Sequence, residues 1–362
     1  MEDKVKKVIA RIDEAIDNLN NKKFTIYFFV IDTKGTPNGS TQYIYEMAKE
    51  LISLGYDIMM LHQEKEFVGV LEWLGEEYAN IPHACIEDEN VKVSTSDFLI
   101  IPEIFANVMN QTKDLPCKRI ILCQNVNHIS EFIPLGVSWD NYKITDVLTT
   151  SEIQAEDIKE LFPNMATQVI SPAIPEYFRN NDVPKKLTVS VVAKDQSLVN
   201  RIVKQFHWKF PSYRWVTFTD LRGLAREEFS TALRESAITI WVDDETYFGY
   251  APIEAIKSGN ILIGKVPNVI PDWMWDKEKK DLVKAGIWFT DIRDVQKITA
   301  NAIKAWMDDL VPTELYNEIE TFENKFTVEN RRDEIAKVFG EYVNGRVTEM
   351  ESVKDKIINK NK

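Results

Sequence analysis

One segment of the chain combines several features that suit phosphate binding. Residues 237–242 form an apolar run with the length of a buried parallel strand. A loop containing Gly249 follows, and then a short helix with Pro252 in its first turn and Gly259 just past its end. Backbone N–H groups and the positive end of a helix dipole therefore meet where the strand ends. This arrangement predicts a seat for a phosphate or diphosphate.

Two carboxylates flank this loop. Glu245 precedes the glycine, and Glu254 lies within the helix. Carboxylate oxygens accept hydrogen bonds from sugar hydroxyls, so the segment predicts a site for a sugar joined to a phosphate. A plainer interpretation remains open for both residues. Glu254 is then a helix acid favoured by the dipole, by about 0.3–1 kcal/mol, and Glu245 is a solvated loop acid.

Residues 244–259 resemble the acidic signature of retaining glycosyltransferases with the GT-B fold, particularly glycosyltransferase family 4. In that family a Glu precedes Gly-Phe-Gly, and a second Glu, an Ala and a small-residue turn follow. The matching pairs are Phe248-Gly249, Glu254-Ala255 and Ser258-Gly259. The first carboxylate of the pattern falls on Thr246, whereas Glu245 stands one residue earlier. Either a one-residue insertion restores Glu245 to this role, or the acidic position has been lost.

The composition is that of an ordinary globular enzyme. The 362 residues are 44% hydrophobic and 28% charged, with a net charge of -13 that argues against general nucleic-acid binding. The longest apolar runs are far shorter than the roughly 20 residues that span a bilayer, and the first residues lack the apolar core of a signal peptide. Three cysteines, Cys85, Cys117 and Cys123, form no metal-ligand spacing, which favours a reducing compartment. We therefore expect a cytoplasmic protein.

Apolar runs of strand length alternate with helical periodicity in two successive series, which predicts two doubly wound α/β domains with parallel sheets. The expected strands are residues 24–31, 57–61, 97–101, 119–123, 146–149 and 168–170, and then 187–193, 214–218, 237–242, 260–263 and 286–289. The expected helices are residues 3–20, 41–54, 197–208, 226–235, 252–258, 291–309, 312–323 and 327–343.

The family resemblance covers roughly residues 23–343 and implies the GT-B fold, in which two Rossmann-like domains face a cleft. The expected parts are an N-terminal helix (1–22), an acceptor-side domain (23–178), a donor-side domain (179–327), a C-terminal helix that packs back toward the N-terminal domain (328–344), and a charged tail (345–362).

The same resemblance implies that the second domain binds a nucleoside-diphosphate sugar as donor substrate, with no bound cofactor and no metal. Glu254 would accept hydrogen bonds from the ribose, and Glu245 would contact the donor sugar or stabilise positive character at the anomeric carbon. The expected diphosphate-binding residues are Phe248, Gly249, Tyr250, Ala251, Lys194 and Arg222. Asp243-Asp244 imitates the metal-binding acidic pair of GT-A enzymes, but its late place in the chain and its GT-B-like context disfavour a metal site.

Three residues of the first domain are also candidates. Gly39, in the turn before the helix at 41–54, would let the backbone approach the donor phosphate or the acceptor. Many relatives have a His directly after the strand at 119–123, near the donor sugar. Here Gln124 occupies that place and His128 follows four residues later. Gln124 and His128 therefore join Glu245 as the candidate catalytic residues.

The resemblance implies a retaining hexosyl- or deoxyhexosyltransferase of polysaccharide biosynthesis that acts on a carbohydrate, glycolipid or small-molecule hydroxyl. The displaced Glu245 and the absence of the family's Gly-Arg…Lys-Gly pattern keep an alternative open. That alternative is a weak or inactive homologue that binds sugar nucleotides or regulates a partner. A phage-type DNA-modifying sugar transferase is disfavoured by the acidic charge.

The N-terminal helix leaves two kinds of partner open. Its basic residues could place it on an anionic membrane surface as a peripheral contact: Lys4, Lys6, Lys7 and Arg11. Acids are interspersed with them: Glu2, Asp3, Asp13, Glu14 and Asp17. They favour a helix that packs on the protein or forms a homodimer.

Overall fold

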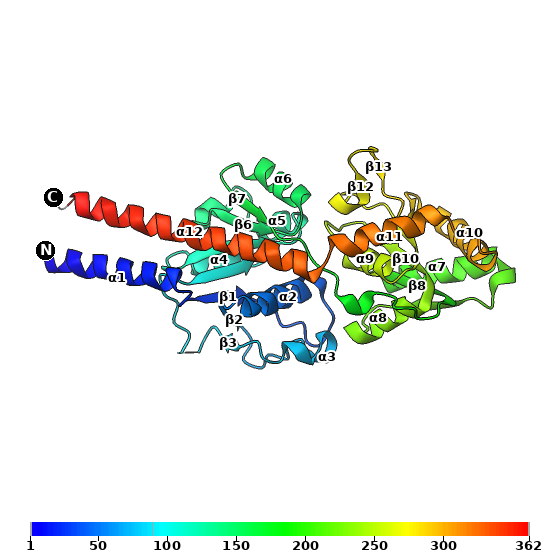
Figure 1. Cartoon of the computed structure of the whole chain (residues 1–362), viewed down its shortest axis with the longest axis horizontal. Coiled ribbons are helices and arrows are strands. Elements are labelled where there is room, and N and C mark those ends of the chain that lie inside the picture. The colour runs from blue at the N-terminus through cyan, green and yellow to red at the C-terminus, as the bar shows by residue number, and fades with distance from the viewer. Residues whose placement is uncertain (1, 89, 361–362) are drawn as a thin grey trace. The chain divides into compact units, whose positions relative to one another are not determined.

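The computed structural model describes residues 2–88 and 90–360, which divide into two compact units. Unit 1 comprises Met1–Leu71, Glu76–Ile170 and Arg332–Lys362, and unit 2 comprises Glu72–Gly75 and Ser171–Arg331. Each unit is built around a parallel sheet with helices, which confirms the expected α/β class with two Rossmann-like parts (Figure 1).

Unit 1 contains a seven-stranded sheet in the order β3-β2-β1-β4-β5-β6-β7, and every neighbouring pair is parallel. Its strands are β1 (Thr25–Phe29), β2 (Asp57–His62), β3 (His83–Cys85), β4 (Phe98–Pro102), β5 (Lys118–Cys123), β6 (Asp146–Thr149) and β7 (Ala166–Val169). The central strands are buried along nearly their whole length, as in β4. Continuous apolar runs therefore form them, because parallel sheets are covered on both faces.

The helices of unit 1 that precede β7 are α1 (Glu2–Asn20), α2 (Gly39–Ser53), α4 (Ala106–Gln111), α5 (Asn127–Phe132) and α6 (Glu152–Leu161), and α3 (Leu71–Leu74) falls at the boundary with the short unit 2 segment Glu72–Gly75. Two of them, α2 and α6, begin at a side-chain cap. The Asn38 side chain accepts a hydrogen bond from the Thr41 backbone N–H at 2.9 Å, and Ser151 caps α6 in the same way. Within the described part of the chain, no helix is both long and apolar enough to cross a membrane.

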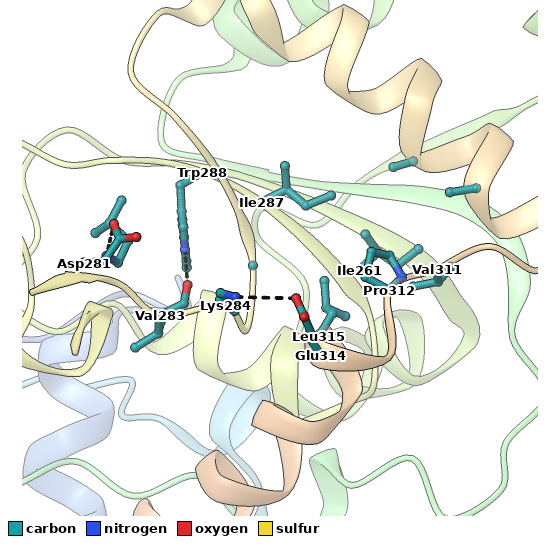
Figure 2. A pocket seen from close by; sticks show the side chains of 14 residues that line it. Ile261, Asp281, Val283, Lys284, Ile287, Trp288, Val311, Pro312, Glu314 and Leu315 are labelled. Atoms are coloured by element: carbon teal, nitrogen blue, oxygen red, sulfur yellow. Dashed lines mark hydrogen bonds and ion pairs between the residues drawn. The ribbon is translucent and has the colours of Figure 1, made fainter. Parts of the chain in front are cut away.

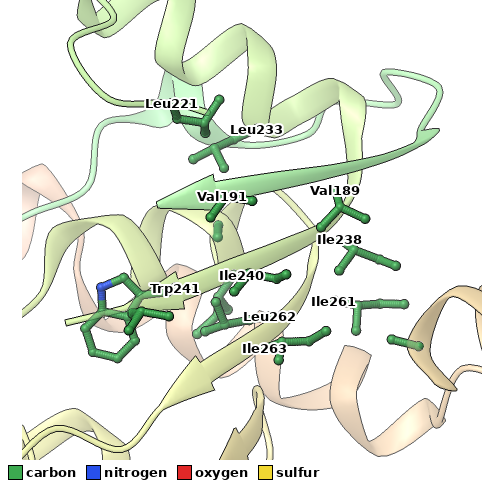
Figure 3. Packing of buried hydrophobic residues seen from close by; sticks show 14 of the residues in the cluster. Val189, Val191, Leu221, Leu233, Ile238, Ile240, Trp241, Ile261, Leu262 and Ile263 are labelled. Carbon is green, nitrogen blue, oxygen red and sulfur yellow. The ribbon is translucent and has the colours of Figure 1, made fainter. Parts of the chain in front are cut away.

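Unit 2 contains a five-stranded parallel sheet in the order β14-β11-β10-β8-β9. Its strands are β8 (Lys186–Ala193), β9 (Thr217–Asp220), β10 (Ser236–Val242), β11 (Ile261–Lys265) and β14 (Ile287–Phe289). Figure 3 shows the core on this sheet, where Val191, Ile240 and Leu262 are fully buried. Burial of about ten such side chains, at roughly 1.5–3 kcal/mol each, is what fixes the register of the central strands.

The helices of unit 2 are α7 (Gln196–Lys209), α8 (Arg226–Glu235), α9 (Tyr250–Lys257), α10 (Val295–Met307) and α11 (Thr313–Lys325). A two-stranded antiparallel pair that the sequence did not predict, β12 (Trp275–Asp276) with β13 (Asp281–Leu282), precedes β14. The Trp288 indole covers Gly264, where a Cβ atom would lie only 2.7 Å from the Trp288 Cε3 atom. Gly264 is therefore needed for close packing of the indole on β11.

The last helix, α12 (Val328–Lys360), is 33 residues long. The expected end at residue 344, followed by a charged tail, is wrong. Specific contacts to unit 1 hold the additional turns: Lys118 Nζ lies 2.9 Å from Glu349 Oε1, and Arg346 donates to the Pro116 carbonyl at 2.7 Å. Met350 is 5% exposed. These contacts join residues far apart in the sequence, so no local pattern announces them.

Candidate active site

The residues predicted to bind the donor follow strand ends in unit 2. Because the five strands are parallel, their carboxyl ends lie at one edge of the sheet, here called the carboxyl edge. The chain runs from β8 out to β9 on one side and then returns to β10 on the other side of β8. The order reverses between β8 and β10, and open α/β sheets bind ligands at such a switch point. Lys194 follows β8 at this point, and residues 243–249 follow β10.

Gly249 sets the start of α9. It is the N-cap, with a φ of +77° in the left-handed region that favours glycine. A Cβ atom here would lie 3.2 Å from Pro252 Cγ and 3.3 Å from Trp241 Cζ2. The preceding Phe248 is buried, and its carbonyl accepts a hydrogen bond from Trp273 Nε1 at 2.5 Å. The turn is therefore fixed on both sides, and a side chain at its apex would be strained by φ and would press on Pro252 and Trp241.

The first turn of α9 begins at the carboxyl edge. Tyr250 and Ala251 are its first two residues, and both are half-buried. Pro252 has no N–H, so the backbone donors of this turn belong to Tyr250 and Ala251. The first N–H groups of a helix have no acceptor inside the helix, and the dipole is positive there. This end of α9 therefore suits an anionic group.

Lys194 lies against the loop that follows β10. Its Nζ is 3.1 Å from Asp243 Oδ1 and donates to the Glu245 carbonyl at 3.3 Å. The Lys194 side chain is 73% exposed, and the Glu245 side chain is exposed as well. Asp244 pairs with Lys265, which ends β11. The structure thus brings together Lys194 and Glu245, two residues that are 51 positions apart in the chain.

The acidic pair Asp243-Asp244 is engaged by these two lysines. Among residues 2–88 and 90–360, no group of three or more His, Cys, Asp or Glu side chains could hold a metal ion. Each aspartate therefore has a cation of the protein itself as its neighbour at the carboxyl edge.

Arg222 is placed by a neighbouring carboxylate at the end of β9. Its Nε lies 3.0 Å from Asp220 Oδ1, and its Nη2 lies 2.6 Å from Asp220 Oδ2. Burial opposes ionisation of Asp220, but the hydrogen bonds from Arg222 outweigh it and lower the pKa of Asp220. The Arg222 side chain is 26% exposed. The bidentate pair fixes the guanidinium, and its charge at the carboxyl edge is largely balanced.

Glu254 lies deeper than the ribose-binding prediction implies. Its side chain is 1% exposed, and Oε1 lies 2.5 Å from Arg226 Nη2 at the start of α8. The Arg226 guanidinium also stacks over the Phe178 ring, 4.7 Å from its centroid. The carboxylate therefore joins α8 to α9 through a buried ion pair. The sequence analysis did not identify Arg226, although an Arg at the first position of a helix, where the dipole disfavours it, is a signal of an acidic partner.

In unit 1 the predicted residues also gather at strand ends. Gly39 is exposed at the start of α2. Gln124 follows β5, and its Nε2 donates to the carbonyl of Ser40 at 3.0 Å. The Gln124 carbonyl in turn accepts a hydrogen bond from Gln154 Nε2 at 2.5 Å. Gln124 is thus close to the turn that contains Gly39, at the switch point between β1 and β4.

His128 is held by a buried acid at the end of β4. Its Nδ1 lies 3.1 Å from Glu103 Oε1, and the same oxygen accepts a hydrogen bond from the Asn125 backbone N–H at 3.0 Å. The Glu103 side chain is 3% exposed, whereas the His128 side chain is 37% exposed. An imidazole oriented by a buried carboxylate, with part of its ring in solvent, is an arrangement that can bind or deprotonate a hydroxyl.

A cavity with a mainly apolar lining lies elsewhere in unit 2. It has a volume of about 370 Å³ and is lined by Ile261 and Ile287, which begin β11 and β14, and by Val311, Pro312 and Leu315 (Figure 2). Lys284 and Glu314 form an ion pair at its wall, with 3.5 Å between Nζ and Oε2. The cavity therefore lies at the amino ends of the strands, and no predicted donor-binding residue lines it.

No protein-family model matches the chain. Solved structures of low sequence identity resemble it over both units. A glycosyltransferase from Rickettsia africae ESF-5 has a TM-score of 0.62 at 13% identity, over 88% of this chain and 98% of that one. Anabaena HepE in complex with UDP-glucose has a TM-score of 0.61 at 13% identity, over 88% and 99%. The pneumococcal O-GlcNAc transferase GtfA in complex with UDP and GlcNAc has a TM-score of 0.62 at 9% identity, over 90% and 99%.

The chain has the GT-B fold. A curated relative is similar in sequence as well: the alpha-1,6-glucosyltransferase of Actinobacillus pleuropneumoniae serotype 7 (strain AP76) is 21% identical over 334 residues, which are 89% of this chain and 96% of the relative. In this GT-B chain the predicted donor residues form two groups. Those at the carboxyl edge are Phe248, Gly249, Tyr250, Ala251, Glu245, Lys194 and Arg222. Glu254 stands apart from them as a buried partner of Arg226.

Proposed function

We propose that this GT-B chain is a retaining glycosyltransferase that moves a sugar from a nucleoside-diphosphate sugar to an acceptor hydroxyl, without a metal ion. The observation that carries the proposal is the switch point of unit 2. The N terminus of a helix capped by Gly249 lies there, and so does Lys194. Gly249 has a φ at which any other residue would be strained.

The names of the similar proteins support a UDP-linked hexose as the donor. HepE and GtfA were solved with UDP or UDP-glucose, and the curated relative is named a glucosyltransferase. We therefore take UDP-glucose as the first donor to test. The acceptor is a sugar or lipid-linked sugar hydroxyl, and its site is proposed to be in unit 1, next to Gln124 and His128.

In this proposal the α9 N terminus and Lys194 stabilise the negative charge that develops on the leaving diphosphate. Glu245 contacts the transferred sugar. The acceptor oxygen forms the new bond to the anomeric carbon as the bond to the diphosphate oxygen breaks. Its proton passes to a diphosphate oxygen on the same face, which retains the configuration. Gln124 and His128 orient the acceptor hydroxyl.

A second candidate function rests on the buried Glu254. With its carboxylate held by Arg226, the site could bind a nucleotide without turnover. The protein would then be a sugar-nucleotide-binding or partner-regulating GT-B homologue, and Glu254 would serve only the packing of α8 on α9.

Calorimetric titration with UDP and UDP-glucose, combined with an assay of donor hydrolysis and transfer, tests both candidates. We compare Gly249→Ala with Gly259→Ala. Both glycines have a left-handed φ, +77° and +74°, but a Cβ at Gly259 meets nothing closer than 3.8 Å. Each substitution should therefore cost about 1–2 kcal/mol of stability for its φ, and only Gly249→Ala should abolish UDP binding.

Three results decide the matter. Binding and turnover that are both lost in Gly249→Ala, and kept in Gly259→Ala, support the transferase. Binding without turnover in the wild-type protein supports the second candidate. Wild-type affinity for UDP in Gly249→Ala would refute the proposed donor seat.

A further inference from the structure

Cations at the carboxyl edge of unit 2 are paired with carboxylates. They lie at or shortly after the ends of β8, β9, β11 and β14. The pairs are Lys194 with Asp243, Arg222 with Asp220, Lys265 with Asp244, and Arg293 with Asp291. A diphosphate is strongly anionic and is stabilised by a nearby cation. A diphosphate that binds at this edge therefore competes with a carboxylate for its cation.

The pair formed by Lys194 is the easiest of these to exchange. Arg222 and Arg293 each lie two residues from their partner and bind it through Nε and Nη2, which fixes both guanidinium groups. The Lys265 side chain is 21% exposed. The Lys194 side chain, in contrast, is 73% exposed, and its ammonium group reaches Asp243 from the neighbouring strand. An exposed lysine–carboxylate pair of this kind contributes little to stability.

Asp243 is held more firmly than its partner. Its side chain is 15% exposed, and Oδ1 also accepts a hydrogen bond from the Glu245 backbone N–H at 3.1 Å. Asp243 thus forms part of the turn that follows β10, whereas Lys194 can swing on a flexible stem. When a diphosphate takes Lys194, the Asp243 carboxylate therefore stays behind and loses its cation.

We propose that Asp243 is a positioning residue for Lys194 and that this exchange of partners favours release of the product nucleotide. The inference rests on the proposed function. In the reaction the bond from the anomeric carbon to the diphosphate oxygen breaks, and its electron pair stays on that oxygen. Once the proton received from the acceptor has passed to water, the product diphosphate has one more negative charge than the donor. The Asp243 carboxylate then repels UDP more strongly than UDP-glucose.

The test is a calorimetric titration of UDP and of UDP-glucose into the wild-type chain and Asp243→Asn. Asparagine keeps an oxygen that can accept the Glu245 N–H, so the turn is retained. The variant should bind UDP about two- to fivefold more tightly, with a smaller gain for UDP-glucose. Asp244→Asn is the matched control, because it removes the same charge from a residue whose partner is Lys265. Its gain in UDP affinity should be smaller.

Lys194→Met separates the exchange from simple repulsion. Without the lysine, Asp243→Asn should raise the affinity for UDP by no more than Asp244→Asn does in the same background. A direct measurement follows Lys194 itself: bound UDP should protect its ammonium group from acetylation, which mass spectrometry of the peptide detects. Circular dichroism checks that all variants are folded.

Equal UDP affinity in Asp243→Asn and the wild-type chain would overturn the inference and leave the donor site standing. The same holds if bound UDP leaves Lys194 open to acetylation. If Asp244→Asn matches the gain of Asp243→Asn in the presence of Lys194, repulsion alone explains it, and the exchange is refuted. A wild-type chain that binds neither UDP nor UDP-glucose would refute the proposed function, and this inference with it.

Discussion

The buried ion pair between Glu254 and Arg226 makes a quantitative prediction about stability. Glu254 is 1% exposed and the Arg226 side chain is 10% exposed, with 2.5 Å between Oε1 and Nη2. Glu254→Ala removes the carboxylate and leaves a buried guanidinium over the Phe178 ring. Loss of one partner of a buried pair costs about 3–5 kcal/mol. Arg226→Met should cost a similar amount, because it leaves a buried carboxylate.

The double variant Arg226→Met/Glu254→Met separates the pair from the packing. Its two unbranched side chains fill similar volumes without charge, and such replacements are often neutral or stabilising. We expect the free energy of unfolding of the double variant to return close to the wild-type value, well above the sum of the single losses. Urea titrations followed by tryptophan fluorescence measure all four proteins. Single variants within about 1 kcal/mol of wild type would refute the reasoning.

The same double variant tests what Glu254 does for the ligand. If its carboxylate also accepts hydrogen bonds from ribose hydroxyls, the stable double variant should bind UDP less tightly. Hydrogen bonds to a charged group contribute about 1.5–3 kcal/mol, which corresponds to about 10–150-fold in affinity. Unchanged affinity would make Glu254 a packing residue alone. Glu254→Ala by itself cannot decide this, since loss of activity and loss of stability coincide in it.

Two further predictions concern other buried groups. Burial lowers the pKa of Lys185 to about 7 from 10.5 in the unfolded chain. The unfolded chain then binds more protons between these values, so the free energy of unfolding should rise with pH from about 7 to 10. In Lys185→Met the free energy of unfolding should rise less over this pH range. Urea titrations at several pH values measure it in both proteins, and an equal rise with pH in both would contradict the assignment. Glu103→Gln weakens the contact that orients His128 and should lower turnover about tenfold or more at unchanged UDP affinity. Turnover at the wild-type rate would show that the imidazole takes no part.

The sequence predicted the central strands well because they are buried on both faces. The apolar residues of β4, β5 and β10 form continuous runs, and the observed bounds differ from the expected ones by one residue. Edge strands are less apolar and gave less signal. The strand expected at 214–218 is observed as β9 at Thr217–Asp220, because Tyr213 and Val216 form a hydrogen-bonded turn before it.

The site shows the same division between local and distant causes. Gly249 and the helix after it could be placed from the sequence, because the turn between a strand and a helix often needs a left-handed φ, which favours glycine. The partner of Glu254 is 28 residues away, and Trp273, which holds the Phe248 carbonyl, is 25 residues away. Spacing rules do not reach such distances. The burial of Glu254 therefore became visible only in three dimensions.

The division of the chain into units affects the order in which the protein can fold during synthesis. Unit 2 is nearly contiguous, from Ser171 to Arg331, whereas unit 1 takes its final segment from Arg332 onward. A ribosome therefore releases the first 170 residues long before the helix that packs Phe339 against Tyr56. Until then the nascent unit 1 lacks this helix, whereas unit 2 is complete once Arg331 has emerged. The segment from Arg332 onward thus completes a unit whose strands all precede unit 2's main segment in the chain.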